Sequence, residues 1–186
     1  MDMIQNIDII TTHWVNGLSG SSLLFDVSLT WISALGIPLL VLAVACQWWV
    51  KTARQHTRHV LVGAGLSFIL GLGLNQVILL LVDRARPYTA GVTKLLTAPS
   101  FDPSFPSDHA TAAFAIAATF AFSGMPRRAV WFGLAALAVA FSRVYIGTHY
   151  ASDVLGGALV GTLAAALVTK LYNRDTRLDR FVTGIF

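Results

Sequence analysis

Long apolar segments alternate with short polar ones along this chain. Five of the apolar segments have roughly the length, about 17 to 25 residues, that a helix needs to cross the hydrocarbon core of a membrane. They lie near residues 27–49, 60–82, 108–123, 129–146 and 153–172, and the third is the shortest. The pattern predicts an all-α integral membrane protein, built as a bundle of five transmembrane helices.

The N-terminal segment has a different pattern. Residues 4–20 read IQNIDIITTHWVNGLSG, which mixes apolar and polar positions at helix-like spacing. This predicts an amphipathic helix that lies in the membrane interface, with a sixth transmembrane span as the alternative. In the last apolar segment, Gly157 and Gly161 form a G-x-x-x-G pair, which indicates close packing of helices. The sequence contains no internal repeat or linker, so we expect a single domain over residues 1–186.

The composition is that of a protein surrounded by lipid. Of the 186 residues, 55% are hydrophobic and 12% are charged, and the mean hydropathy is +0.68. A soluble domain of this length would expose far too much apolar surface. Cys46 is the only cysteine, so no intramolecular disulfide can form. The net charge is +4, but the basic residues are divided among loops, which argues against nucleic-acid binding.

The charges in the loops predict an orientation. If the five spans alternate in direction, nine of the 13 Lys and Arg residues fall on one side. Cytoplasmic loops carry an excess of Lys and Arg, so we expect the N-terminus outside and the C-terminus in the cytoplasm. The nine residues are Lys51, Arg54, Arg58, Arg127, Arg128, Lys170, Arg174, Arg177 and Arg180. The outer side carries Arg84, Arg86, Lys94 and Arg143.

Two short polar segments stand out from their apolar surroundings, and both fall on the predicted outer side. Residues 106–109 read PSDH, and residues 142–153 read SRVYIGTHYASD. They resemble the second and third signature motifs of the type 2 phosphatidic acid phosphatase superfamily, P-S-G-H and S-R-x5-H-x3-D. Arg86-Pro87 resembles the end of the first motif, K-x6-R-P. The third motif matches in full, at Ser142, Arg143, His149 and Asp153. The resemblance implies an integral-membrane lipid phosphatase.

Phosphate-ester chemistry requires groups that neutralise the phosphate before a nucleophile can attack. Arg86 and Arg143 are suited to this task, because a guanidinium donates two parallel hydrogen bonds to phosphate oxygens. Ser107 precedes an apolar segment and is predicted to be a helix N-cap. The free backbone N–H groups of Asp108 and His109 would then point towards a bound anion.

The third motif also supplies a candidate nucleophile. His149 and Asp153 lie four residues apart, a spacing that lets the carboxylate hold one imidazole nitrogen and leave the other free to attack. The resemblance implies that His149 forms a phosphohistidine. It also implies that His109 protonates the leaving lipid oxygen and later activates water, without a metal or another cofactor. A metal-dependent phosphatase built on aspartates is an alternative, but no metal-ligand spacing supports it.

Two positions depart from the family motifs. Leu79 occupies the lysine position of the first motif, and Asp108 replaces the glycine of the second. These features resemble the bacterial undecaprenyl-diphosphate phosphatase branch linked to bacitracin resistance, over about residues 75–157. Arg84 is the candidate for the missing cation, because an extended backbone would place it on the same side as Arg86.

That branch implies a C55 isoprenyl diphosphate as the substrate. Its terminal phosphate would be removed at the outer face of a bacterial inner membrane, which regenerates the monophosphate carrier for cell-wall synthesis. Phosphatidic acid, phosphatidylglycerol phosphate and a lipid A phosphate are alternative substrates. A transporter or flippase is the alternative from another class, although the predicted spans hold almost no ionisable residue near the midplane.

Overall fold

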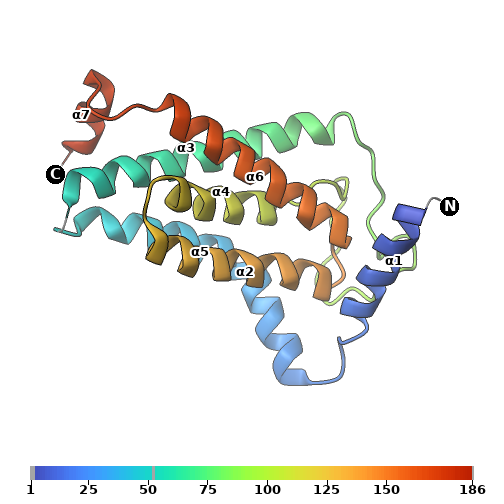
Figure 1. Cartoon of the computed structure of the whole chain (residues 1–186). Coiled ribbons are helices and arrows are strands. Elements are labelled where there is room, and N and C mark those ends of the chain that lie inside the picture. Colours follow the sequence, from blue (N-terminus) through green and yellow to red (C-terminus); the bar gives the residue numbers. More distant parts are fainter. Residues whose placement is uncertain (1–2, 52, 186) are drawn as a thin grey trace.

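The computed structural model describes residues 3–51 and 53–185, and the regular structure in this part of the chain is entirely helical. In chain order the elements are α1 (Met3–Asn16), α2 (Leu23–Cys46), the 3₁₀ helix η1 (Gln47–Trp49), α3 (Arg54–Leu79), α4 (Asp108–Phe122), α5 (Pro126–Tyr145), α6 (Ala151–Leu171) and α7 (Arg177–Thr183). Helices α2 to α6 form a bundle, with α1 at one end and α7 near the other (Figure 1). The predicted all-α fold is confirmed.

Among the described residues, four helices are long and apolar enough to cross a membrane. They are α2 extended through η1, α3, α5 and α6. The third predicted span, near residues 108–123, corresponds to α4, which has 15 residues and is therefore about 22 Å long, less than the hydrocarbon thickness of about 30 Å. Helix α4 packs against α3, α5 and α6, and most of its residues are buried. The longer helices thus enclose the short one.

Two glycines bring α6 into contact with the backbone of α4. A Cβ atom added at Gly161 would lie 2.2 Å from the carbonyl oxygen of Thr111, and one added at Gly157 would lie 2.4 Å from that of Ser107. No side chain fits at either position unless the helices move apart. The close packing predicted from the G-x-x-x-G pair is therefore present. It sets the start of α4 beside the start of α6, where the Ser107 N–H donates to the carbonyl oxygen of Asp153 over 3.0 Å.

The connections that carry the sequence motifs gather at one end of the bundle. Residues 80–107 link α3 to α4, and residues 146–150 link α5 to α6. Both connections lie at the end where α1 is found, whereas the α4–α5 turn at residues 123–125 lies at the opposite end (Figure 1). The segments predicted to share one side of the membrane are therefore together.

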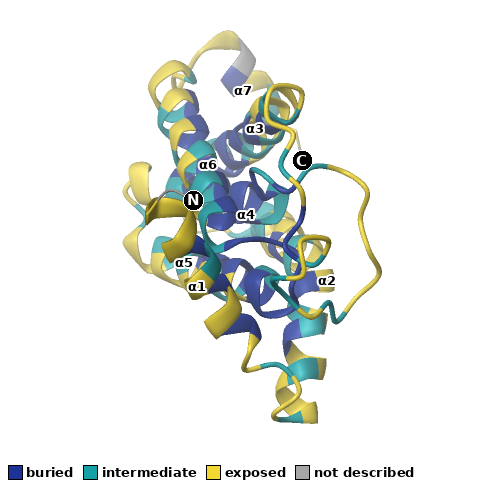
Figure 2. Cartoon of the chain, turned by 90° about the vertical axis from the view of Figure 1, so that its right-hand side faces the viewer, coloured by how far each residue is buried: buried dark blue, intermediate teal, exposed yellow. Residues whose placement is uncertain are grey.

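Helix α1 is present in the segment where an amphipathic helix was predicted. Its polar residues Asp8, Thr12 and Asn16 are buried against the protein, while apolar residues such as Ile4 and Ile7 are exposed. Figure 2 views this end of the bundle and shows the exposed outer surface of α1. The apolar stripe faces away from the protein, which is the arrangement expected of a helix that lies against lipid.

Candidate active site

Three chain segments converge at the end of the bundle beside α1. They are residues 84–87 after α3, residues 100–109 leading into α4, and residues 142–153 between the last turn of α5 and the first turn of α6. A cavity of about 130 Å³ lies between them. Its polar lining residues are Arg86, Ser100, Asp102, Asp108, His109, Arg143 and His149. Five residues predicted from the motifs are therefore brought together around one space.

His149 presents an unprotonated nitrogen next to a cation. Its side chain is buried, and Nδ1 lies 2.8 Å from the backbone carbonyl oxygen of Ser104. A carbonyl oxygen can only accept a hydrogen bond, so Nδ1 carries the proton and Nε2 keeps its lone pair. Nε2 lies 3.5 Å from Nη1 of Arg86, which also borders the cavity. This tautomer is the one that a nucleophilic Nε2 requires.

The surroundings of His149 favour the neutral imidazole. Burial lowers the pKa of His149 below the ordinary value, the carboxylate of Asp153 opposes this shift, and the charges of Arg143 and Arg86 reinforce it. Oδ2 of Asp153 lies 3.6 Å from Nδ1, which is beyond hydrogen-bond distance. The sequence predicted that Asp153 itself would hold the imidazole. In the structure, the carbonyl oxygen of Ser104 accepts that hydrogen bond, and Asp153 acts through its charge.

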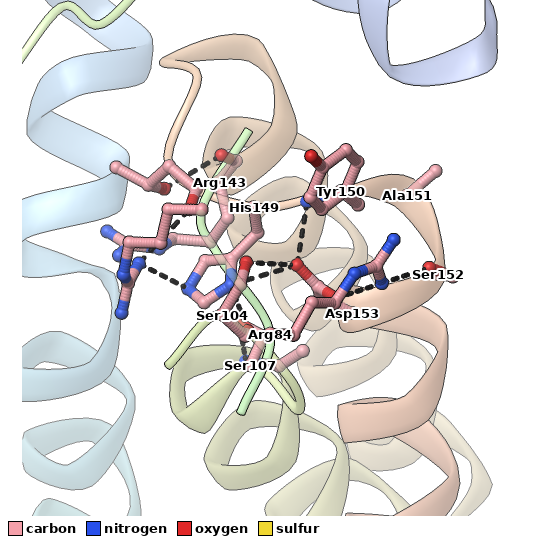
Figure 3. A network of polar contacts seen from close by, with 12 residues as sticks. Arg84, Ser104, Ser107, Arg143, His149, Tyr150, Ala151, Ser152 and Asp153 are labelled. Atoms are coloured by element: carbon pink, nitrogen blue, oxygen red, sulfur yellow. Dashed lines mark hydrogen bonds and ion pairs between the residues drawn. The ribbon is translucent and has the colours of Figure 1, made fainter. Parts of the chain in front are cut away.

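Asp153 organises the residues behind His149. Its carboxylate is fully buried. Oδ2 accepts hydrogen bonds from the Tyr150 backbone N–H over 2.8 Å and from the Ser104 hydroxyl over 2.5 Å (Figure 3). Ser104 thus binds Asp153 with its side chain and His149 with its main chain. The spacing of the third motif alone gives no sign of this intermediate residue.

Arg86 is buried, and each of its three guanidinium nitrogens donates a hydrogen bond to the protein. Its Nη1 donates to the carbonyl oxygen of Thr148 over 3.1 Å, and its Nε and Nη2 donate to the carbonyl oxygen and the carboxylate of Asp102, each over 3.0 Å. Burial acts to raise the pKa of Asp102, but a hydrogen bond from Ser100 and the charge of Arg86 outweigh it and hold that pKa below its usual value. Asp102 is therefore an anion that faces Arg86.

Arg143 brings a second cation to the cavity and is incompletely paired. Its Nη1 donates to the hydroxyl of Ser33 on α2 over 2.6 Å. Its Nε is buried and has no hydrogen-bond partner among the described residues. Leaving such a donor without an acceptor costs about 1–3 kcal/mol. Because Arg143 lines the cavity, an anion bound there could supply the missing acceptor.

The start of α4 supplies the remaining motif residues. Ser107 is the N-cap, as its position predicted, and its hydroxyl accepts from the Ala110 N–H over 3.5 Å. Ser107 is fully buried and does not border the cavity, whereas Asp108 and His109 do. The carboxylate of Asp108 accepts a hydrogen bond from Asn75 of α3 over 2.8 Å. Asn75 is a polar residue within an otherwise apolar segment, and this contact gives its side chain a partner.

Arg84 lies outside the set of residues that border the cavity. Its Nη1 is 2.5 Å from Oδ1 of Asp153, and its Nη2 is 2.6 Å from Oδ2 of Asp8 on α1. Its guanidinium carbon also lies 4.0 Å from the centre of the Tyr150 ring. This geometry does not favour Arg84 as the replacement for the missing first-motif lysine, because two buried carboxylates already take up its charge.

A larger cavity, of about 400 Å³, lies at the opposite end of the bundle. Residues of α3, α4 and α6 surround it, and His56, His59, Tyr172 and Arg174 are among its polar lining residues. None of the motif residues borders it. The smaller cavity, by contrast, combines a buried imidazole with two arginines, so the composition of its lining, and not its size, makes it the candidate site.

Comparisons with known proteins match the same part of the chain. The family model of the PAP2 superfamily matches residues 60–177. The undecaprenyl-diphosphatase BcrC of Bacillus subtilis is 34% identical over 160 residues, which cover 82% of this chain and 78% of that protein. The bacitracin transport permease protein BcrC of Bacillus licheniformis is 32% identical over 132 residues, which cover 69% of this chain and 63% of that protein.

A solved structure shares the fold. The crystal structure of the transmembrane PAP2 type phosphatidylglycerolphosphate phosphatase from Bacillus subtilis has a TM-score of 0.71 and 24% sequence identity, and the match covers 95% of this chain and 90% of that one. The family match extends over more than half of the chain and includes the segments that surround the cavity. This chain belongs to the PAP2 superfamily.

Proposed function

We propose that this membrane protein is a lipid phosphatase that hydrolyses undecaprenyl diphosphate to undecaprenyl phosphate at the outer face of a bacterial inner membrane. One observation carries the proposal. His149, whose Nε2 carries no proton, borders a small cavity together with Arg86 and Arg143, and Nε of Arg143 has no hydrogen-bond partner among the described residues. A nucleophile beside two guanidinium groups is the arrangement that an anionic phosphate ester requires. The similarity to an undecaprenyl-diphosphatase supports the choice of substrate.

The reaction proceeds in two displacements. Arg86 and Arg143 bind the terminal phosphate, and the incoming anion competes with Asp102 for Arg86. Nε2 of His149 attacks the terminal phosphorus, and a P–N bond forms while the bond from phosphorus to the bridging oxygen breaks. His109, which takes up a proton when the anionic substrate is bound beside it, donates that proton to the bridging oxygen, and the lipid monophosphate leaves. His109 then takes a proton from water, which attacks the phosphohistidine, breaks the P–N bond and releases inorganic phosphate.

Asp153 stabilises the intermediate of this reaction. Nδ1 of His149 keeps the proton that it donates to the carbonyl oxygen of Ser104. Phosphorylation at Nε2 therefore leaves a positively charged ring. The buried carboxylate of Asp153 lies 3.6 Å from that ring nitrogen. Charges at this distance interact strongly in a buried site. Asp153 is therefore expected to favour the phosphohistidine over the free imidazole.

The placement of charge in the spans favours hydrolysis over transport. The Asp, Lys and Arg residues of the described spanning helices lie within a few residues of the helix ends, as Asp26, Arg143, Asp153 and Lys170 illustrate. Transport sites usually place polar groups near the membrane midplane.

The proposed orientation rests on the loops, since the catalytic end carries four of the 13 basic residues.

The test is phosphate release by the purified protein in detergent, with EDTA present. We expect hydrolysis of an isoprenyl diphosphate at a higher kcat/KM than hydrolysis of phosphatidic acid or phosphatidylglycerol phosphate. His149→Ala is the matched control, and we expect it to be inactive and to form no acid-labile phosphoenzyme. Turnover by His149→Ala would overturn the mechanism. A preference for a phospholipid would overturn the substrate but leave the mechanism intact.

A further inference from the structure

The polar face of α1 binds the start of α6. Asp8 is 8% exposed, and its Oδ1 accepts a hydrogen bond from the Ser152 backbone N–H over 2.8 Å. One turn further along α1, the hydroxyl of Thr12 accepts from the Ala151 N–H over 2.9 Å. The first N–H groups of a helix lack partners within the helix. Here α1 provides two of these partners from more than 130 positions away in the sequence.

Arg84 connects Asp8 to the catalytic residues. Its Nη2 is 2.6 Å from Asp8, and its Nη1 is 2.5 Å from Asp153. Because the two nitrogens bind different carboxylates, the planar guanidinium is held in one orientation. Asp153 accepts from the Ser104 hydroxyl, and the Ser104 carbonyl oxygen accepts from His149. Figure 3 shows the contacts from Arg84 to His149, and Asp8 completes the series on the far side of Arg84.

Charge gives a second reason to connect Asp8 with catalysis. Arg84 paired with Asp153 alone would neutralise the carboxylate that lies beside His149. With Asp8 included, two carboxylates share one guanidinium, and the group keeps one net negative charge. A negative group stabilises the cationic ring that phosphorylation of His149 produces. The two ion pairs also hold Arg84 in place outside the set of residues that border the cavity.

We propose that Asp8 is a positioning residue for the reaction at His149 and that it acts through Arg84 on Asp153. This inference rests on the proposed function, in which His149 is the nucleophile. Asp8 lies outside residues 60–177, the part of the chain that matches the PAP2 superfamily. Its role follows from the contacts of α1.

The variant Asp8→Asn keeps the shape of the side chain but removes its charge. We expect kcat for an isoprenyl diphosphate to fall about 10- to 100-fold, the range for loss of one charge-assisted hydrogen bond. We expect KM to stay within about threefold of the wild-type value, because Asp8 does not border the cavity. Asp8→Glu restores the charge, and we expect it to recover most of the lost kcat.

Thr12→Val is the matched control, because Thr12 is also buried and also binds an N–H group of α6 but carries no charge. We expect Thr12→Val to lower the melting temperature while its kcat stays within about threefold of wild type. Wild-type kcat in Asp8→Asn would overturn the proposal. Equal losses of kcat in Asp8→Asn and Thr12→Val would also overturn it, since α1 would then act only as a structural anchor.

A second comparison covers the case in which Asp8→Asn alone does not fold. Arg84→Met leaves the carboxylates of Asp8 and Asp153 facing each other without a cation, so we expect a large loss of kcat. Adding Asp8→Asn removes that repulsion, and we expect the double variant to be faster than Arg84→Met. A double variant as slow as Arg84→Met would contradict the proposal. Wild-type turnover and its loss in His149→Ala test the proposed function separately, so the two failures are distinguishable.

Discussion

At the scale of single residues, the kind of hydrogen-bond partner decides which nitrogen of His149 carries the proton. The carbonyl oxygen of Ser104 cannot donate, so it assigns the proton to Nδ1. An ionised carboxylate in place of the Ser104 carbonyl oxygen would impose the same tautomer, because it too can only accept a hydrogen bond. Arg86 and Arg143 act on the same ring through their charges, which disfavour its protonation. The imidazole is thus held in the tautomer and the neutral form that the proposed mechanism requires.

A pH dependence follows from these contacts. Burial and the two arginines lower the pKa of His149, so its neutral form, which the proposed mechanism requires, persists below the ordinary histidine pKa of about 6.5. We expect an NMR titration of labelled histidines in detergent, assigned by comparison with His149→Ala, to place the His149 midpoint below about pH 6.5. Asp153 opposes the shift, so Asp153→Asn should move the midpoint to still lower pH. A higher midpoint in Asp153→Asn would contradict this account.

At the scale of elements, the position of α4 depends on how closely α6 approaches it. The motif residues at the start of α4 meet those at the start of α6 because two glycines remove the side chains that would separate the helices. Small residues are the usual means by which membrane helices pack closely. The same contact therefore serves both the stability of the bundle and the shape of the cavity.

Substitution of Gly161 tests this contact. In Gly161→Ala the new methyl group would meet the α4 backbone at Thr111 and Ala115, and overpacking of this kind costs about 1–3 kcal/mol. We expect a lower melting temperature in detergent and a loss of kcat. Gly65→Ala is the matched control, since a Cβ there meets no atom within 4 Å, and alanine stabilises an exposed helix position by about 0.5–1 kcal/mol. Equal melting temperatures for the two variants would contradict the packing argument.

At the scale of the whole molecule, the bundle separates two differently charged ends. The end with the candidate active site carries Arg84, Arg86, Lys94 and Arg143, and the other nine Lys and Arg residues lie towards the opposite end. Such a division orients a membrane protein with its more basic end in the cytoplasm. The proposed substrate would then be hydrolysed at the outer face of the membrane.

Cysteine labelling in intact cells tests this orientation. In a Cys46→Ala background, single cysteines replace Thr97 in the loop before α4 and Asn173 after α6, both of which are exposed. We expect an impermeant maleimide to label the cysteine at position 97 from outside and the one at position 173 only after the cells are opened. The reverse pattern would place the active site in the cytoplasm and exclude an outer-leaflet substrate.

The sequence alone determined the fold class, the approximate helices and five of the residues around the cavity. Apolar length predicts helices that cross a membrane because each helix must satisfy its own backbone in lipid. The motifs predicted Arg86, Asp108, His109, Arg143 and His149 because their spacing is a local property of the chain. The spacing of Gly157 and Gly161 likewise predicted close packing of helices, although it did not name α4 as the partner.

Only the tertiary structure decided how these residues are supported. Ser104 forms hydrogen bonds with both His149 and Asp153, and Arg84 forms an ion pair with Asp8. Asp8 and Asp153 lie far apart in the sequence, and neither forms a pattern with Arg84 that periodicity could reveal. Which carboxylate a guanidinium binds depends on distance and burial in the folded chain. The packing of α1 against α6 therefore decided which carboxylates Arg84 binds. The position of Arg84 two residues before Arg86 did not reveal these partners.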